Sequence, residues 1–133
     1  MKLYSMNKVD LLTKFLESFE NSEWQFIDEI IDEEIEHEIV WNGITHKGKT
    51  DMTQIFKLIK EVFPSLTISL KEMIDLGEFS IAKCDGHHYE ERKYKKFKMC
   101  FYIRWRNGKI FRIIEYQTTF DNPSCNGHLL MST

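Results

Sequence analysis

The strongest constraint on the fold is a two-residue alternation in residues 96–106. One set of side chains is apolar: Phe97, Met99, Phe101, Ile103 and Trp105. The other set is mostly basic or polar: Lys96, Lys98, Cys100, Tyr102, Arg104 and Arg106. Because successive side chains of a strand point to opposite faces, the pattern predicts a strand with one buried face. Asn107-Gly108 is typical of a tight hairpin and predicts a last strand over residues 110–120.

Changes of hydrophobic period predict the other elements. A helical period predicts helices over residues 8–19 and 24–31, the second capped by Ser22. A third helix over residues 52–62 is expected to be capped by Thr50 or Asp51 and to end at Pro64. Two-residue alternation predicts strands over residues 35–41, 45–47, 66–76 and 78–88, the first two joined by Asn42-Gly43. Helices that are segregated from a run of antiparallel strands indicate an α+β fold.

Length and composition indicate one globular domain. The chain has 133 residues, of which 42% are hydrophobic and 29% charged, so it can bury a core. We assign a single domain to residues 1–120 and a C-terminal tail to residues 121–133, where the periodicity is lost. We find no signal peptide and no run near the roughly 18 apolar residues of a membrane helix. We therefore expect a cytoplasmic protein that does not bind a membrane.

The cysteines do not form a recognisable site. Cys84, Cys100 and Cys125 are odd in number and widely spaced. This favours reduced thiols over a disulfide framework or a zinc site. His87 and His88 are adjacent in a predicted strand and should point to opposite faces, while His46 is expected to be solvated. We therefore expect no metal, and in the absence of nucleotide-binding motifs we expect no cofactor.

The order and spacing of several short motifs resemble one family. They are Ile39-Val40-Trp41-Asn42-Gly43, His46-Lys47-Gly48, Phe63-Pro64-Ser65-Leu66, Asn107-Gly108-Lys109-Ile110 and Glu115-Tyr116. In this order the chain resembles the nuclear transport factor 2-like superfamily, in its SnoaL-like and ketosteroid-isomerase-like branch. The resemblance implies a conical, cystatin-like roll. Three N-terminal helices would pack in a strongly curved, mainly antiparallel six-stranded sheet, with a pocket at the wide end.

The resemblance also allows the isomerase site to be compared position by position. The base on the first strand of that family falls near His37. The two groups that stabilise the oxyanion fall at about Phe15 and Phe101. A phenyl ring donates no hydrogen bond, and the loss of one such donor costs about a hundredfold or more in rate. Isomerase chemistry of that type is therefore not expected here.

Two ionisable residues stand on faces that are otherwise apolar. His37 interrupts the row of Ile35, Ile39 and Trp41, and Glu115 follows Phe111 and Ile113 at period two. Such a pair could act as general acid and base, or could anchor a polar group of a ligand. The structural alternative is a His37 bonded to a backbone carbonyl or water and a Glu115 that points to the rim or pairs with a basic neighbour.

A set of mostly aromatic residues is expected to line the pocket: Phe15, Trp41, Phe56, Phe101, Ile103, Trp105 and Ile113. The alternative for each is plain core packing. A cone lined in this way suits a small, largely apolar ligand with one or two polar groups.

Charge is unevenly distributed along the chain. Residues 17–38 contain only acidic charges, whereas residues 83–112 are mainly basic. We interpret the lysines of residues 92–98, among which Tyr94 and Phe97 are interleaved, as part of a solvated outer sheet face, and we expect no nucleic acid partner. The outer row with Cys100, Tyr102 and Tyr116 is partly aromatic, and the family resemblance implies a homodimer through it.

These observations lead to two functional hypotheses. The first is a SnoaL-like domain that binds a small apolar molecule, with cofactor-free isomerase, cyclase or lyase chemistry at His37 and Glu115 as its catalytic form. The second is a non-catalytic binding or adaptor domain that acts through dimerisation or a protein partner. The missing oxyanion donors favour the second, and the polar pair on apolar faces favours the first.

Overall fold

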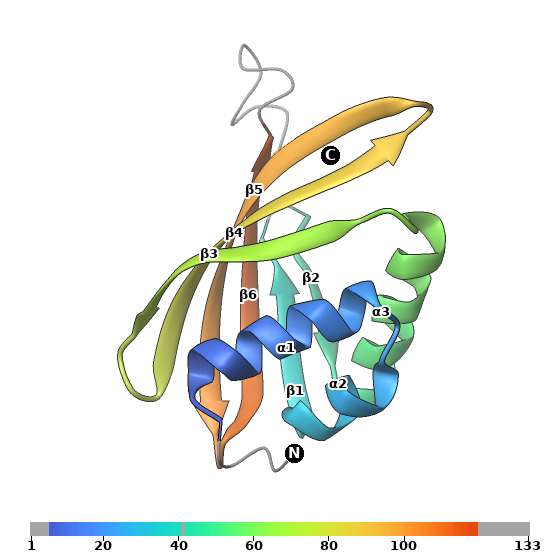
Figure 1. The fold of residues 1–133 in the computed structure, drawn as a ribbon. Helices are drawn as coiled ribbons and strands as arrows, with labels where there is room; N and C mark the ends of the chain where they lie inside the picture. The colour runs from blue at the N-terminus through green and yellow to red at the C-terminus, as the bar shows by residue number, and fades with distance from the viewer. Residues whose placement is uncertain (1–5, 41, 120–133) are drawn as a thin grey trace.

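The structure is a computed structural model that describes residues 6–40 and 42–119 (Figure 1). Three helices and six strands follow in the order α1 (Lys8–Glu20), α2 (Trp24–Ile30), β1 (Ile31–Ile39), β2 (Ile44–Lys47), α3 (Lys49–Val62), β3 (Thr67–Asp75), β4 (Phe79–Glu90), β5 (Lys93–Arg106) and β6 (Lys109–Thr119). The strands form one sheet in the order β2-β1-β6-β5-β4-β3. Only the β1–β6 pair is parallel. The predicted α+β roll with a mainly antiparallel six-stranded sheet is confirmed.

The helices cover one face of the sheet. Figure 1 shows α1, α2 and α3 gathered inside the curve of the sheet, with α1 lying across it. Helix α1 packs against β3, and α3 packs against β1 and β2. Because the helical faces and the inner faces of the strands are apolar, they bury each other and leave the outer sheet face to solvent.

The helix starts differ from the sequence-based expectation. Ser22 adopts a positive φ of 57°, and α2 has Glu23 at its N-cap position with no side-chain cap bond. Helix α3 begins directly after Gly48, whose φ of 88° lets the chain turn straight into the helix. Asp51 therefore lies inside the first turn of α3, where its charge suits the helix dipole, instead of capping it. The predictions of Ser22, Thr50 and Asp51 as caps are wrong.

The alternating row on β5 is buried as predicted. Its inner residues, from Phe97 to Trp105, face small residues on β4, because Phe97 pairs with Gly86 and Phe101 pairs with Ala82. Large side chains on one strand thus lie over small ones on its neighbour. The hairpin to β6 is a tight turn in which Asn107 and Gly108 both have positive φ, 52° and 74°, as the sequence predicts.

Two strands depart from the predicted pattern. Strand β1 begins at Ile31, which the sequence assigned to the second helix. Strand β6 contains a bulge, because Arg104 pairs with Arg112 while Trp105 pairs with Ile110. The bulge takes Phe111 out of the inner row, and its ring lies under the Arg106 guanidinium, 3.9 Å from Cζ to the ring centroid. The inner face of β6 is therefore continued by Ile110 and not by Phe111.

Neither of the two cysteines among the described residues is in a disulfide. Cys84 and Cys100 are free thiols, and burial raises the pKa of Cys84 to about 12. Cys125, Trp41 and the predicted tail over residues 121–133 lie outside the described residues. In the described part of the chain, none of the helices combines the length and the apolar character needed to cross a bilayer.

Candidate functional site

A cavity of about 880 Å³ lies between the helices and the inner face of the sheet. This volume falls within the usual range for small-molecule sites. Its wall is mostly aromatic and aliphatic, with phenylalanine rings from α1, α3, β5 and the segment after α3: Phe15, Phe19, Phe56, Phe63, Phe97 and Phe101. The ring of Phe56 meets Phe15 and Phe19 edge to face, at centroid distances of 5.8 and 5.9 Å.

Most of the predicted lining residues border this cavity. Phe15, Phe56, Phe101, Ile103 and Ile113 all lie on its wall.

Trp105 does not border it. Its indole Nε1 donates a hydrogen bond of 2.9 Å to Ser80 Oγ in the packed part of the core. Because this bond satisfies the only polar atom of the indole, Trp105 acts as a core residue. Trp41, the remaining predicted lining residue, is outside the described residues.

His37 and Glu115 meet on the cavity wall. Their strands, β1 and β6, run parallel and adjacent, with His37 paired to Ile113 and Glu115 paired to Ile39. His37 Nε2 lies 3.0 Å from Glu115 Oε1. The His37 side chain is 2% exposed and the Glu115 side chain 16% exposed. The carboxylate is thus the more accessible group, and the imidazole lies behind it.

An aromatic ring of α3 lies beside His37. The ring of Phe56 lies 6.1 Å from it, centroid to centroid, and His37 Nδ1 is buried without a hydrogen-bond partner. Most buried polar atoms have a partner, so an unpartnered nitrogen calls for an explanation. The alternative in which a backbone carbonyl binds this imidazole is not the arrangement seen.

His46 is a site residue that the sequence analysis missed. It lies opposite His37 in the β1–β2 ladder, and the two rings are 5.8 Å apart, centroid to centroid. The His46 side chain is 16% exposed and borders the cavity, so the expectation that it is solvated is wrong. The signal was present, because a tight turn at Asn42-Gly43 places His46 opposite the inner row of the first strand, and directly opposed residues of a hairpin share a face.

The two adjacent histidines of β4 diverge as predicted. The ring of His88 points inward and meets Phe63 at 5.1 Å, centroid to centroid. The ring of His87 points outward and meets Tyr94 at 5.3 Å. Across residues 6–40 and 42–119, no three His, Cys, Asp or Glu side chains are grouped closely enough to hold a metal ion.

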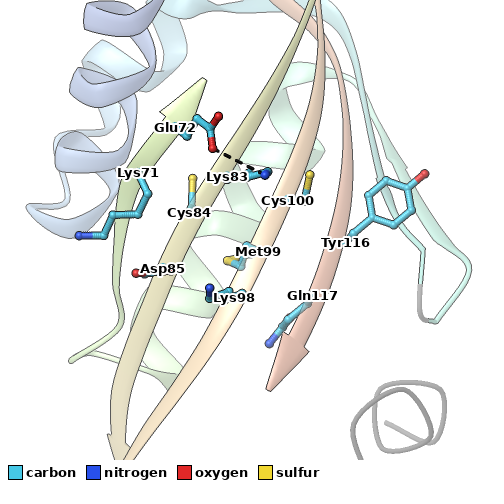
Figure 2. Close-up of a pocket in the computed structure, with 10 residues that line it drawn as sticks. All are labelled: Lys71, Glu72, Lys83, Cys84, Asp85, Lys98, Met99, Cys100, Tyr116 and Gln117. Carbon is cyan, nitrogen blue, oxygen red and sulfur yellow. Dashed lines mark ion pairs between the residues drawn. The ribbon is translucent and has the colours of Figure 1, made fainter. Parts of the chain in front are cut away.

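A second, shallower groove of about 630 Å³ lies over β3, β4, β5 and β6 and is shown in Figure 2. Lys83 and Glu72 form an ion pair of 3.6 Å on it. Cys100 and Tyr116 are neighbours across the β5–β6 ladder, and the side chain of Tyr116 projects from the sheet (Figure 2). Most of the residues that line this groove are charged or polar, in contrast to the mostly aromatic and aliphatic wall of the inner cavity.

Comparison with known proteins identifies the family. A model of the SnoaL-like domain matches residues 12–113. IdmH from Streptomyces antibioticus, described as a candidate polyketide cyclase, superposes with a TM-score of 0.75 at 12% identity over 96% of this chain and 100% of its own. TerC, crystallised with polyporic acid, gives 0.73 at 14% identity over 94% and 98%. No curated protein sequence is a significant match.

A third solved structure agrees with these two. It is a protein with a ketosteroid isomerase-like fold from Catenulispora acidiphila, in complex with trimethylamine, with a TM-score of 0.72 at 9% identity over 80% of this chain and 83% of its own. At such low identities the structures show the fold alone. The family match, however, covers most of the chain and contains His37 and His46. The protein therefore belongs to the SnoaL-like domain family.

Proposed function

We propose that the protein binds a small, largely apolar molecule in the inner cavity, and that Glu115 and His37 hold or transfer a proton at its polar end. The observation that carries this proposal is the 3.0 Å contact between the two side chains on a wall made mostly of phenylalanine and aliphatic groups. A polar pair in such a wall fixes the orientation of a ligand that has one polar group.

The two residues have different roles. Glu115 is the more accessible, so its carboxylate is the group that meets the ligand, and His37 orients it from behind. A carboxylate held by an imidazole in an apolar cavity is suited to accept or return a proton. The catalytic form of this proposal is a cofactor-free isomerase, cyclase or lyase.

The wall facing Glu115 limits that chemistry. Phe101 is the residue directly across from Glu115 in the β5–β6 ladder, and Phe15 borders the same cavity. Neither ring can donate a hydrogen bond to a developing oxyanion. Proton transfer by Glu115 would therefore proceed without the oxyanion donors of the steroid isomerases, and a non-catalytic binding domain is the alternative outcome.

Two fluorescent probes of matched shape test the proposal. Phenylnaphthylamine carries one N–H donor, and in benzylnaphthalene a CH2 group replaces that N–H. Both should bind the wild-type protein. Glu115→Ala should weaken binding of the amine by about tenfold, the value of a hydrogen bond to a charged group, and leave the hydrocarbon nearly unchanged.

The controls separate the cavity from its polar pair. Phe101→Trp, which fills the cavity, should weaken binding of both probes. Glu61→Ala, an exposed carboxylate on α3, should change neither. Failure of the wild-type protein to bind either probe would overturn the proposal, and an equal effect of Glu115→Ala on both probes would remove Glu115 from the site.

We also infer that the outer sheet face forms a homodimer interface. Tyr116 is exposed on this face, and it stands beside Cys100 and the row of Tyr102 and Ile114. An exposed aromatic row on a sheet favours a partner surface. Light scattering after size exclusion should give a dimer for the wild type and for Leu58→Glu on α3, and a monomer for Tyr116→Glu. A monomeric wild type would contradict it.

A further inference from the structure

The inner cavity is bordered by a second imidazole that the proposed function does not use. His46 lies on β2, directly opposite His37. Its ring is tilted 37° to that of His37, with the centroids 5.8 Å apart. The side chain of His46 has the same exposure as that of Glu115, 16%, whereas His37 is 2% exposed. Of the two imidazoles, His46 is therefore the more accessible to a ligand in the cavity.

A carboxylate stands behind this second imidazole. Asp51, in the first turn of α3, places its Oδ2 3.5 Å from His46 Nδ1. In carboxylate–histidine pairs, a carboxylate at Nδ1 holds the proton there and leaves Nε2 as a free base. The contact is longer than an ideal hydrogen bond, as such contacts commonly are before a substrate binds. The arrangement orients Nε2 of His46 away from Asp51.

The cavity is therefore bordered by two imidazoles that each have a carboxylate neighbour, although Asp51 itself is not a lining residue. In the first pair, Glu115 is accessible and His37 supports it. In the second, His46 is accessible and Asp51 supports it. The titratable groups around His46 are Asp51 on α3, His37 on β1 and, behind His37, Glu115 on β6. Strands β6 and β2, which flank β1 in the sheet, thus present one accessible carboxylate and one accessible imidazole to the same space.

We propose that His46, held by Asp51, is a second acid/base residue of this cavity and works together with Glu115. This inference rests on the proposed function of the cavity. Its chemistry is a proton shift within one ligand. His46 Nε2 takes a proton from a carbon next to a carbonyl, and the C–H electron pair forms a carbon–carbon double bond.

The Glu115–His37 pair supplies the second proton transfer of this reaction. As the carbonyl electron pair moves to oxygen, the Glu115–His37 pair gives that oxygen a proton. One proton enters the protein and one leaves it, so the ligand becomes an enol with no other reactant. Return of the two protons to different atoms gives an isomer. The ligand class is thus an apolar carbonyl compound with an acidic C–H bond.

Protection of His46 from chemical modification tests this placement without a known substrate. Diethyl pyrocarbonate acylates unprotonated imidazole nitrogens, and the modified histidine is located by peptide mass spectrometry. With phenylnaphthylamine at ten times its dissociation constant, acylation of His46 should slow by about tenfold. His87, which points outward beside Tyr94, should react at an unchanged rate and serves as the internal control.

A second measurement tests the role of Asp51. Nitrogen NMR of the imidazoles should show His46 with its proton on Nδ1. Asp51→Asn should redistribute that proton between the two nitrogens. The matched control, Glu61→Gln on the same helix, should leave the His46 signals as they are. If Asp51 had only a structural role, Asp51→Asn would leave the distribution of the His46 proton between Nδ1 and Nε2 unchanged.

The outcomes are distinguishable. If the probe binds and His46 is not protected, or if Asp51→Asn does not change the tautomer, the role of His46 is overturned while the cavity remains a binding site. If the probe does not bind to the wild-type protein, both the proposed function and this inference fail. Protection together with the tautomer change supports the inference.

Discussion

The two ends of the inner sheet face differ in how they are filled. At the packed end, defined by Ile30, Ile31, Trp105 and Ile110, the side chains are almost fully buried and none of them borders the cavity. At the hollow end, defined by Phe15, Phe56, Phe97 and Phe101, phenylalanine rings surround open space. Strand β5 contributes to both ends: Phe97, Met99, Phe101 and Ile103 of its apolar row border the cavity, and Trp105 packs in the core.

The residues that face the row explain the difference. At the packed end, Ile31 of β1 and Trp105 of β5 both pair with Ile110 of β6, and Ser80 accepts the indole hydrogen bond. Branched side chains from several elements fill the space there. At the hollow end, the neighbours include Glu115, His37 and Gly86, which are polar or lack a side chain. The same hydrophobic pattern therefore has two functions according to what lies opposite.

The largest expected loss of stability comes from a substitution in the packed end. Ile31→Ala removes three buried methyl or methylene groups from a site with 0% exposure and should lower the free energy of unfolding by ~2–5 kcal/mol. Urea denaturation followed by circular dichroism measures this change as a shift of the midpoint at a constant slope.

The matched variant at the hollow end is Ile59→Ala, because Ile59 of α3 is partly buried and borders the cavity. It should cost clearly less, since the atoms removed already face open space. Equal losses for the two isoleucines would contradict the division into a packed and a hollow end.

The next largest loss of stability is expected from a substitution of Gly86, which lies under the Phe97 ring at the hollow end. A Cβ atom on Gly86 would overlap Cε2 and Cζ of the Phe97 ring, so Gly86→Ala must displace that ring toward the cavity. We expect the unfolding free energy to fall by ~1–3 kcal/mol, the usual cost of overpacking. The cavity should shrink as well, so titration with phenylnaphthylamine should show weaker binding.

A double-mutant cycle checks the cause. Phe97→Leu removes the overlapping ring atoms, so Gly86→Ala should cost less stability in the Phe97→Leu background than in the wild type. Simple additivity of the two changes would show that the ring is not what Gly86 accommodates.

Much of the fold followed from the sequence. The period-two row on β5 predicted its buried face, and the Asn107-Gly108 dipeptide predicted its turn. These signals are local, because each is set by neighbouring residues in one strand or hairpin. The bulge at Phe111 was not predictable in this way, since it depends on how β6 pairs with β5 and not on its own pattern.

The site was predicted in part. Period two placed His37 and Glu115 on inner faces, but their 3.0 Å contact requires the parallel pairing of β1 with β6, which joins distant parts of the chain. Which apolar residues border the cavity depends on what fills the space beside them. Trp105 and Phe101 therefore look alike in the sequence and differ in the structure. His46 could have been found from its place opposite the first strand across the Asn42-Gly43 turn, whereas the position of Asp51 beside it depends on where α3 begins.

The smallest expected effect concerns an ion pair at the rim of the packed end. Asp32, next to Ile31 on β1, accepts hydrogen bonds of 2.8 and 3.3 Å from the guanidinium of Arg106 on β5. The hydrogen bond from Arg106 holds the pKa of Asp32 below its usual value. The Arg106 side chain is 41% exposed, so solvent screens the pair and Asp32→Asn should cost at most about 1 kcal/mol near neutral pH.

The sign of the pH dependence follows from the lowered pKa of Asp32. The folded state binds the Asp32 proton less readily than the unfolded state, so the pair stabilises the fold above the ordinary carboxyl pKa of about 4. That contribution is lost as the pH falls through the lower value of the folded state. Urea denaturation should therefore show a gap in unfolding free energy between wild type and Asp32→Asn at about pH 7 that closes as the pH is lowered below the ordinary carboxyl range. Glu34→Gln, whose carboxylate is 3.7 Å from Arg106 and 77% exposed, should show a smaller gap. A larger gap for Glu34→Gln than for Asp32→Asn would show that Glu34, and not Asp32, is the main partner of Arg106.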